Sequence, residues 1–377
     1  MKYYLVAGEA SGDLHGSLLI KALKKRDPNP EFRFIGGDKM ATEAGNEPFM
    51  HFSGMAFMGF LEVAKNLRTI LGNLKKSEKD ILCFEPNALI LIDFPGFNLR
   101  IAEKAKKAGL RVYYYISPKI WAWNSKRALK IKKNIDHMFV IFPFEVDFYR
   151  KWGMEVDYVG NPLMDSIQDF KNQEFDKTPF ANSEISKSSR PIIALLPGSR
   201  KQELEYILPT MLKIIPDFPN YDFIIAGSPS LGLDIYKKYL GEFIVPVLFN
   251  ETYSLINRAT LAIVTSGTAA LEAALLNCPE VIVYKTSRIS YEIAKKVILV
   301  RYISLVNLIM DQEIVKELIQ GKCTPSNISK EAKKLLPGNL ERDKMLQQYS
   351  LLQDKVGKPG ASFRTANLIF EYMDHGK

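Results

Sequence analysis

The chain has 377 residues, of which 47% are hydrophobic and 25% charged, and a formal net charge of +9, which is ordinary for a globular protein of about two domains. Its three cysteines are too widely spaced for a metal-ligand pair or a disulfide framework, which favours a reducing compartment. The early glycine and acid argue against a signal peptide, and no apolar run approaches the roughly 18 residues of a spanning helix, so we expect a soluble or peripheral protein.

Short apolar runs alternate with helical patterns along most of the chain. The first are a strand pattern, "KYYLVAG", at 2–8 and a helix pattern, "LHGSLLIKALKK", at 14–25. Further strand patterns, with amphipathic or basic helices between them, follow at 87–93, 111–117, 137–142 and 156–160. This alternation predicts an α/β fold with a doubly wound parallel sheet.

The alternation stops in the polar stretch 165–190 and then restarts. The second set of strand patterns lies at 191–200, 221–229, 243–249, 260–267 and 280–286. We therefore predict two Rossmann-like domains that face each other across a cleft. Residues 1–165 form the first domain and 166–356 the second, and a C-terminal helix at about 357–377 packs back on the first.

Basic residues are concentrated in one part of the first domain. Between Arg100 and Lys133 there are eleven Lys or Arg and a single acid, Glu103. Nucleic acid, an anionic bilayer surface or a phosphorylated substrate would fit this excess of positive charge. A solvated helix face is the structural alternative.

The loop after the first strand, "AGEASGDLHG" (Ala7–Gly16), contains the first candidate residues. Gly8 and Gly12 permit a tight turn. Glu9 has no evident structural task, which leaves it available for a ligand. His15 fits a packing or capping role as well as a catalytic one.

A second candidate follows the strand at 87–93, in "ILIDFPGFN" (Ile90–Asn98). A carboxylate at the carboxyl end of a central strand is expected to face the cleft. Desolvation by Phe94 and Phe97 would raise the pKa of Asp93 and make it a better general base. A cap for the next helix is the alternative.

In the second domain, "LPGSRKQE" (Leu196–Glu203) follows a strand and opens a helix. Gly198 allows close approach of the backbone, Ser199 and the helix N-terminus offer N–H groups, and Arg200 presents a planar fork to phosphate oxygens. This pattern favours a phosphate site over an ordinary turn with a capping serine.

"TSGTAALEAAL" (Thr265–Leu275) repeats that design. Ser266, Gly267 and Thr268 open a helix that can hold a second phosphate, and Glu272, about one turn later, can accept both hydroxyls of a ribose. A capping motif with a surface Glu is the alternative. Two anion loops on one sheet indicate a nucleotide diphosphate, whereas the lack of GxxxxGK[ST] and GxGxxG motifs argues against a P-loop ATPase and NAD.

Several motifs in order resemble those of the lipid-A-disaccharide synthases, from residue 3 to about 320. They are "AGEASGD", "GGDKM" (36–40), "IDFPGFN", "SPKIWAW", "FPFE" (142–145), "LPGSR" and "SGTAALE". The resemblance implies an inverting glycosyltransferase of the GT-B fold. Such an enzyme joins UDP-2,3-diacylglucosamine to 2,3-diacylglucosamine 1-phosphate (lipid X), which gives lipid A disaccharide 1-phosphate and UDP in lipopolysaccharide biosynthesis.

The resemblance also implies a place of action, the cytoplasmic face of the inner membrane of a Gram-negative bacterium, with peripheral attachment to its anionic surface. Neither nucleic acid nor a cofactor is expected, and a homodimer is left open. The chain departs from the family pattern at Asn161, where the family has His, and at Gly96, where it has a second acid. The second change favours Asp93 as the essential carboxylate, and Asn307 is retained.

These implications assign roles to residues. Asp93 is the predicted base for the acceptor hydroxyl, with Glu9 or His15 orienting the acceptor. No convincing Asp-x-Asp pair follows a strand, so we expect Arg200 and the helix N-termini to neutralise the diphosphate without metal. The predicted donor-binding residues are Gly198, Ser199, Arg200, Gln202, Ser266, Gly267, Thr268, Ala269, Glu272 and Asn307.

Acylated substrates require contact with a bilayer surface, where Trp and Tyr favour the headgroup level and Lys and Arg attract anionic lipid. "VYYYISPKIWAWNSKR" contains all four types, although Trp121 also fits the protein interior, and the Met/Phe stretch 52–67 also fits a core helix. The predicted acceptor or membrane contacts are Ser11, Gly12, Met55, Phe57, Met58, Phe60, Lys119, Trp121, Trp123, Lys126 and Arg127.

Two rival functions remain at this stage. Another GT-B enzyme that uses UDP-GlcNAc, such as an epimerase or the lipid II-forming transferase, would keep the nucleotide loops but not the "WAW" and "IDFPGFN" segments. A non-enzymatic basic protein that binds membrane or nucleic acid would account for the charge excess and leave both diphosphate loops unexplained.

Overall fold

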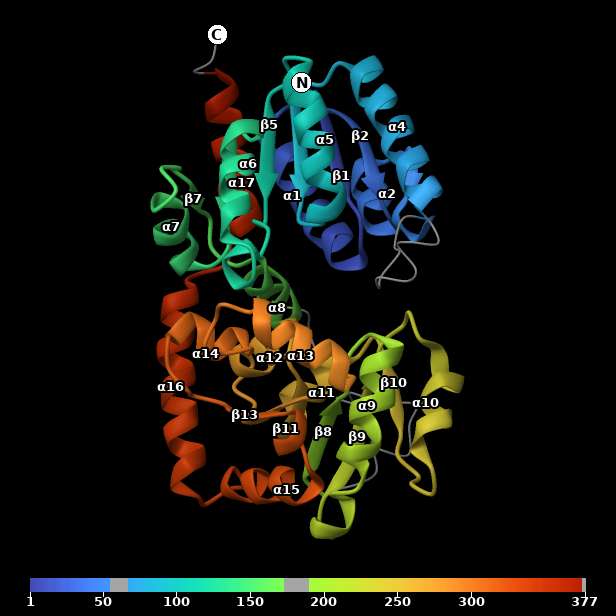
Figure 1. Cartoon of the computed structure of the whole chain (residues 1–377), viewed down its shortest axis with the longest axis vertical. Helices are drawn as coiled ribbons and strands as arrows, with labels where there is room; N and C mark the ends of the chain where they lie inside the picture. Colours follow the sequence, from blue (N-terminus) through green and yellow to red (C-terminus); the bar gives the residue numbers. More distant parts are fainter. Residues whose placement is uncertain (55–66, 173–189, 375–377) are drawn as a thin grey trace. The chain divides into compact units, whose positions relative to one another are not determined.

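The computed structural model describes residues 1–54, 67–172 and 190–374. The chain divides into two compact units, which we call the first unit (Met1–Asp165 with Pro359–Lys377) and the second unit (Ser166–Lys358). Each is built on one parallel sheet with helices against it (Figure 1). The predicted α/β fold with two Rossmann-like domains is therefore confirmed.

The first unit holds a seven-stranded sheet in the order β3-β2-β1-β4-β5-β6-β7. Each residue of β4 and β5 is buried, because helices cover both faces of a parallel sheet, and such strands appear in the sequence as continuous apolar runs. The strands are β1 (Lys2–Ala7), β2 (Glu31–Gly36), β3 (Met50–His51), β4 (Ala88–Ile92), β5 (Val112–Tyr115), β6 (His137–Val140) and β7 (Asp157–Tyr158).

The C-terminal helix belongs to the first unit, as predicted. It packs against α1, and the Arg26 guanidinium lies 5.4 Å from the centre of the Phe370 ring. Asp165 accepts from the N–H groups of Ala361 and Ser362 at 3.3 and 3.2 Å and so caps this helix. The helices are α1 (Ala10–Arg26), α2 (Asp38–Ala44), α4 (Leu67–Phe84), α5 (Pro95–Lys107), α6 (Ala128–Asn134), α7 (Pro143–Arg150) and α17 (Ala361–Asp374), and α8 (Pro162–Asn172) crosses the division between the units.

The second unit holds a six-stranded sheet in the order β10-β9-β8-β11-β12-β13. Its strands are β8 (Ile192–Leu196), β9 (Asp222–Gly227), β10 (Val247–Phe249), β11 (Ala259–Thr265), β12 (Glu280–Tyr284) and β13 (Lys316–Ile319). Its helices are α9 (Lys201–Leu212), α10 (Gly232–Leu240), α11 (Thr252–Arg258), α12 (Thr268–Leu275), α13 (Arg288–Val297), α14 (Leu305–Met310), α15 (Pro325–Lys334) and α16 (Leu340–Val356).

In both sheets the strand order reverses beside the first strand. The chain goes from β1 to β2 on one side and later to β4 on the other, and in the second unit β8 lies between β9 and β11 in the same way. Such a switch point opens a crevice at the carboxyl ends of the two strands beside it, and ligands of open α/β sheets bind there. The candidate loops are therefore expected after β1, β4, β8 and β11.

Helix length and hydropathy bear on the membrane question. Among the helices of the described residues, none is both long enough and apolar enough to traverse a bilayer.

Candidate functional site

Two carboxylates follow the strands beside the switch point of the first sheet. Glu9 lies two residues after the end of β1, and Asp93 is the first residue after β4. Ala7 pairs with Ile92, so the two strands end at the same level of the sheet. The structure thus brings Glu9 and Asp93 to the edge at which ligands bind in such sheets.

The backbone at this edge is strained. Asp93, Phe94 and Ile116 have φ angles of 42°, 47° and 67°, a region that residues with a Cβ atom, and β-branched residues most of all, rarely adopt. Such conformations cost about 1–3 kcal/mol each and concentrate at functional sites. All three residues directly follow the neighbouring strands β4 and β5, so the strain lies where the sequence places the base.

Hydrogen bonds hold the Asp93 backbone in this conformation. Its N–H donates to the carbonyl of Tyr115 at 3.0 Å. Its carbonyl accepts from the Tyr114 hydroxyl at 2.5 Å and from the Asn98 amide at 2.8 Å. We had assigned no role to Asn98 or Tyr114. Asn98 lies within a motif that we had singled out, whereas nothing distinguished Tyr114 from the two tyrosines beside it.

Two glycines act here through close packing. A Cβ atom at Gly8 would lie 2.1 Å from the Phe94 ring, so the absence of a side chain lets this ring lie against the end of β1. A Cβ atom at Gly12, which is buried, would lie 3.2 Å from the Cβ of Ala7, so the absence of a side chain lets α1 approach the strand closely. Neither glycine has a positive φ, so their role is to admit neighbours.

Burial, two neighbouring charges and a hydrogen bond from the Phe94 backbone determine the protonation of Asp93. Burial of its carboxyl group raises its pKa to about 6, while the ammonium group of Lys119 lowers the pKa and the carboxylate of Glu9 raises it. The group is therefore mostly ionised at neutral pH, with a proton affinity high enough for general base catalysis, which works best when the pKa lies near the working pH.

This electrostatic arrangement predicts the pH dependence of turnover. Because a base acts only when it is deprotonated, kcat/KM should fall on the acid side with a midpoint near pH 6. Lys119→Met removes a charge that favours the carboxylate, so the midpoint should move to higher pH. Glu9→Gln removes a charge that disfavours it, so the midpoint should move to lower pH. The measurement is kcat/KM against pH for the three proteins.

Lys133→Met is the matched control, because Lys133 is also exposed in the basic segment 100–133, is not a predicted contact and does not perturb the Asp93 pKa. Its profile should coincide with that of the original protein. If the profiles of all four proteins coincide, the group whose titration limits kcat/KM is not Asp93.

The remaining candidates of the first loop differ in exposure. Ser11 is exposed and donates from its hydroxyl to the Glu9 carboxylate at 2.7 Å, so the two side chains form one polar group. His15 is half-buried, and burial lowers its pKa to about 4, so the imidazole is neutral at pH 7. Its Nδ1 atom is buried without a hydrogen-bond partner among the described residues.

The two tryptophans that lie one residue apart have different surroundings. Trp121 is 8% exposed and packs edge-on against Phe144, at a centroid distance of 4.9 Å. Its indole N–H donates to Glu145 at 3.0 Å. Trp123 is 43% exposed, with the Arg127 guanidinium 4.5 Å from its ring.

Glu145 fixes the loop that carries Trp121. Its carboxylate is buried and accepts from the Ser117 hydroxyl at 2.5 Å as well as from the Trp121 indole. The second oxygen accepts from the N–H groups of Ile141 and Phe142 at 3.1 and 2.9 Å. Burial raises the pKa of Glu145, and these hydrogen bonds oppose the shift. The carboxylate thereby joins the loop after β5 to the start of α7.

The candidates of the second unit also lie at a switch point. Leu196 pairs with Val264, so the loops after β8 and β11 leave the sheet side by side. Gly198 has a φ of 104°, a conformation open mainly to glycine. The structure thus brings the two predicted anion loops together.

In the loop after β8 an internal carboxylate occupies the predicted anion position. Glu203 accepts from the N–H groups of Ser199 and Arg200 at 2.9 and 3.2 Å. It also pairs with the Arg200 guanidinium at 3.0 Å. An oxyanion is therefore already bound by the groups that we had predicted for phosphate. Glu203 lay in the motif, but its role was not foreseen.

The loop after β11 is tied to a distant part of the chain. The Ser266 hydroxyl donates to the carbonyl of Ile303 at 2.8 Å. Gly267 and Thr268 are exposed at the start of α12, and Ala269 is half-buried. The N–H groups of a first helical turn have no partner within the helix, which leaves them available for an anion.

Glu272, the predicted ribose ligand, is half-buried and already has one partner. Its carboxylate accepts from the Tyr253 hydroxyl at 2.9 Å, and burial raises its pKa. Tyr253 was not foreseen, because it lies on α11 and approaches Glu272 only in the folded unit. Gln202 is exposed in the first turn of α9.

Asn307 lies inside the second unit. Its amide oxygen accepts from the N–H groups of Ile314 and Val315, at 2.7 and 3.0 Å. Its amide nitrogen donates to the Val315 carbonyl and to Glu317, both at 2.9 Å. Glu317 in turn accepts from the N–H of Ile303. Asn307 is thus well placed to position the segment that holds Ser266.

Four predicted contacts, Met55, Phe57, Met58 and Phe60, lie outside the described residues. Of the other predicted acceptor or membrane contacts, Lys119 and Lys126 are exposed and Arg127 is half-buried.

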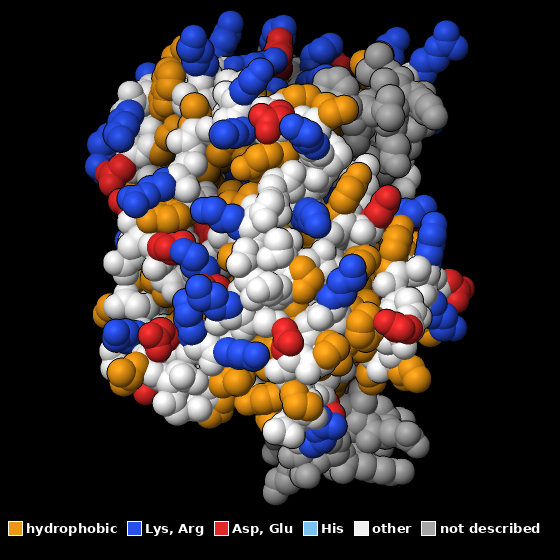
Figure 2. Space-filling view, turned by 60° about the horizontal axis from the view of Figure 1, so that its bottom comes forward, with side chains coloured by type: hydrophobic (Ala, Val, Ile, Leu, Met, Phe, Trp, Pro, Cys, Tyr) orange, Lys and Arg blue, Asp and Glu red, His pale blue; other side chains and the backbone are white. Residues whose placement is uncertain are grey.

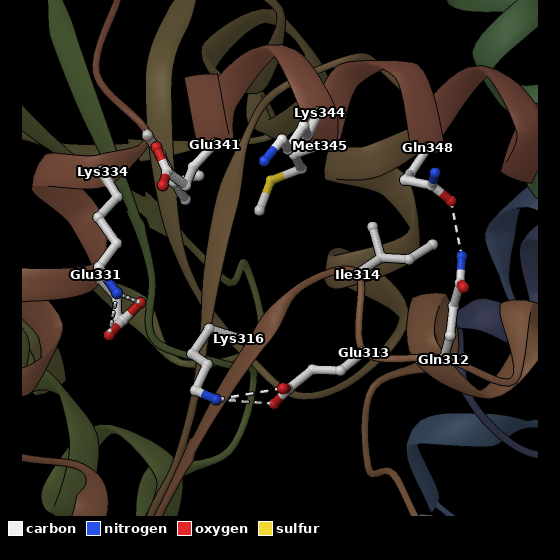
Figure 3. A pocket seen from close by; sticks show the side chains of 11 residues that line it. Gln312, Glu313, Ile314, Lys316, Glu331, Lys334, Glu341, Lys344, Met345 and Gln348 are labelled. Carbon is white, nitrogen blue, oxygen red and sulfur yellow. Dashed lines mark hydrogen bonds and ion pairs between the residues drawn. The ribbon is translucent and has the colours of Figure 1, made fainter. Parts of the chain in front are cut away.

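A pocket of about 360 Å³ lies in the second unit away from the anion loops (Figure 3). Acidic and basic side chains alternate around it, and Lys316 and Lys334 are paired with Glu313 and Glu331 at 3.1 and 2.8 Å. Lys316 begins β13, so the pocket lies at the amino end of this strand, opposite the ligand edge of a parallel sheet. We assign the ligand to the loops and not to this pocket.

Comparison with known proteins decides the family. The family model described as lipid-A-disaccharide synthetase matches residues 3–364. The lipid-A-disaccharide synthase of Syntrophus aciditrophicus is 40% identical over 370 residues, which covers 96% of this chain and 95% of that protein. The one from Trichlorobacter lovleyi is 37% identical, over 98% and 97% of the two chains. The chain belongs to the lipid-A-disaccharide synthase family. The resemblance seen in the motifs is thereby confirmed.

Solved structures confirm the GT-B-like fold. The UDP-GlcNAc 2-epimerase from Neisseria meningitidis superposes with a TM-score of 0.69 at 14% identity, over 98% of this chain and 100% of that chain. The glycosyltransferase of kitacinnamycin gives 0.63 at 12% identity, over 99% and 98% of the two chains. At this identity the likeness concerns the fold alone, and it gives no support to an epimerase activity.

Proposed function

We propose that this glycosyltransferase of lipid A biosynthesis transfers diacylglucosamine from UDP-2,3-diacylglucosamine to the 6-hydroxyl of lipid X, with Asp93 as the base. Membership of the lipid-A-disaccharide synthase family supports the substrates. The observation that carries the mechanism is the strained and half-buried Asp93 at the switch point of the first sheet, with its raised pKa.

The reaction requires one proton transfer and one bond exchange. Asp93 takes the proton of the acceptor hydroxyl as its oxygen attacks the anomeric carbon of the donor from the face opposite UDP. The bond between that carbon and the diphosphate breaks, and UDP leaves with the electron pair. Because the attack comes from the opposite face, the configuration at this carbon is inverted. Glu9, which accepts from the Ser11 hydroxyl, would position the acceptor.

The second unit is proposed to bind UDP. The N–H groups and the guanidinium that now hold Glu203, together with the start of α12, would neutralise the charge that develops on the diphosphate. Glu272 would accept hydrogen bonds from the ribose hydroxyls. Asn307 would position the 303–307 segment, which holds Ser266, and would not contact the donor directly. Catalysis without metal follows from this supply of positive charge and remains a prediction.

Attachment to an anionic membrane surface is part of this proposal, and a homodimer is left open. Trp123, Lys126 and Leu129 are exposed, and Arg127 lies over the Trp123 ring. In Figure 2 the visible surface carries basic side chains mixed with hydrophobic and acidic ones. Because both substrates carry acyl chains, such a surface fits an enzyme that works at the cytoplasmic face of the inner membrane.

A single assay tests the proposed function. Purified protein is incubated with UDP-2,3-diacylglucosamine, UDP-GlcNAc and lipid X, with and without EDTA, and the products are analysed by mass. We expect UDP and a tetra-acyl disaccharide 1-phosphate. Turnover of UDP-GlcNAc with the acylated donor left intact would refute the proposal in favour of another GT-B activity. Formation of product only without EDTA would refute the metal-free mechanism alone.

A further inference from the structure

Helix α13 of the second unit has an apolar face that nothing in the described structure covers. None of its ten residues is buried. Ile289, Ile293 and Val297 recur every four positions and are 76%, 60% and 46% exposed. Residues with this spacing lie on one face of a helix. An amphipathic helix of a globular protein normally turns such a face to the core, so the orientation of α13 needs another explanation.

The helix is attached to the unit by its other side. Tyr291 and Ala294 are the residues of α13 that are partly buried. Tyr291 lies opposite the line of Ile289, Ile293 and Val297, and Ala294 lies about a quarter turn from it. The apolar face therefore points away from the unit to which the helix is anchored, and the exposed Ile298 and Leu299, 41% and 64% exposed, extend the apolar surface beyond its end.

The charges around this face are mostly positive. Arg288 and Lys296 lie about a quarter turn from the apolar stripe, with one acid, Glu292, between them. Lys295 lies on the opposite side of the helix, and Arg301 follows its end. Within the described residues no ion pair is found for these four cations, whereas many other surface Lys and Arg side chains of the chain are paired. Unpaired cations beside an exposed aliphatic stripe are typical of helices that lie in the interface of an anionic bilayer.

We propose that α13 is a second membrane-docking element, which inserts Ile289, Ile293 and Val297 among the acyl chains of an anionic bilayer while Arg288 and Lys296, which flank this stripe, contact the headgroups. The inference rests on the geometry of α13 and does not depend on the transferase activity. It extends the membrane contact proposed for the first unit to the unit that is proposed to bind UDP. The second unit would then have its own attachment to the surface that holds the acylated substrates.

Vesicle binding of the full-length protein tests the inference. The probes are vesicles of phosphatidylcholine with and without phosphatidylglycerol, and the readout is the partition coefficient from flotation. Ile289→Ser/Ile293→Ser should lower binding to the anionic vesicles about ten-fold, since two large apolar side chains no longer enter the acyl region. Arg288→Gln/Lys296→Gln should lower it about 25-fold, at roughly five-fold per charge, and should weaken its salt dependence.

The matched control is Ile244→Ser/Leu351→Ser, which changes two exposed aliphatic residues of the same unit outside α13. It should leave vesicle binding unchanged. UDP binding in solution, measured on each variant, reports whether the second unit is intact, and a failure of the proposed transferase would leave the flotation result valid.

Three results would overturn the proposal. The first is unchanged vesicle binding by both α13 variants. The second is a lower mass in solution for Ile289→Ser/Ile293→Ser with vesicle binding unchanged, which would assign the face to a second copy of the chain. The third is a higher KM for the acylated donor with vesicle binding unchanged, which would assign it to a substrate acyl chain.

Discussion

Asp93→Asn is expected to lower turnover by about 10²–10⁴-fold, the range that general base catalysis contributes. The amide has the shape of the carboxylate but cannot take the proton of the acceptor hydroxyl. UDP binding should persist, because the two anion loops lie in the other unit. The measurements are the initial rate of disaccharide formation and the affinity for UDP.

The stability of this variant separates lost chemistry from lost fold. Burial raises the pKa of Asp93, so above pH 6 the ionised group destabilises the folded state relative to the unfolded one. Removal of that charge should leave Tm unchanged or higher at pH 7.5. Asp147→Asn is the control, since this carboxylate on α7 is exposed, and its rate should be normal. A near-normal rate for Asp93→Asn would exclude Asp93 as the base.

The position of the candidate site followed from the sequence because it depends on a rule of topology. A strand at 87–93 that ends in an acid, and loops of Gly and Ser after strands, are local patterns, and the switch-point rule places them at one edge. The central strands β4, β5, β8 and β11 could be predicted for a different reason. Strands that are buried on both faces appear in the sequence as continuous apolar runs.

Elements with weaker patterns were missed or misplaced. β2 and β13, with exposed or charged residues among the apolar ones, were not identified as strands. The strand predicted at 243–249 begins only at Val247 in the structure, because Pro246 lacks the backbone N–H that hydrogen-bonding to a neighbouring strand requires.

Partners that come together only in the fold were beyond local pattern. Nothing in the sequence connects Glu145 with Trp121, so the separation of Trp121 and Trp123 into a buried and an exposed ring was left open. Asn307 was placed among the donor contacts, yet its amide is engaged within its own segment. A polar residue in a motif has two readings, contact with a ligand or support of one, and only the hydrogen-bond partners distinguish them.

Arg200→Ala is expected to weaken UDP binding by about 10²-fold, for two reasons that act in the same direction. The variant loses a charge-assisted hydrogen bond to the diphosphate, worth about 1.5–3 kcal/mol. It also leaves the Glu203 carboxylate without its guanidinium partner beside the N–H groups of the loop, where it competes with phosphate. The measurement is the Kd for UDP by calorimetry, with Lys237→Ala, an exposed cation on α10, as the control.

A double-mutant cycle separates the two reasons. If both act, Glu203→Gln in the Arg200→Ala background should recover part of the affinity, because the competing charge is removed while the hydrogen bond from Arg200 stays lost. Full recovery in the double variant would mean that Arg200 only neutralises Glu203, and an affinity within two-fold of the original protein for Arg200→Ala alone would remove it from the UDP site. Partial recovery would show that the Glu203 carboxylate occupies the position of the diphosphate in this loop and is displaced when UDP binds.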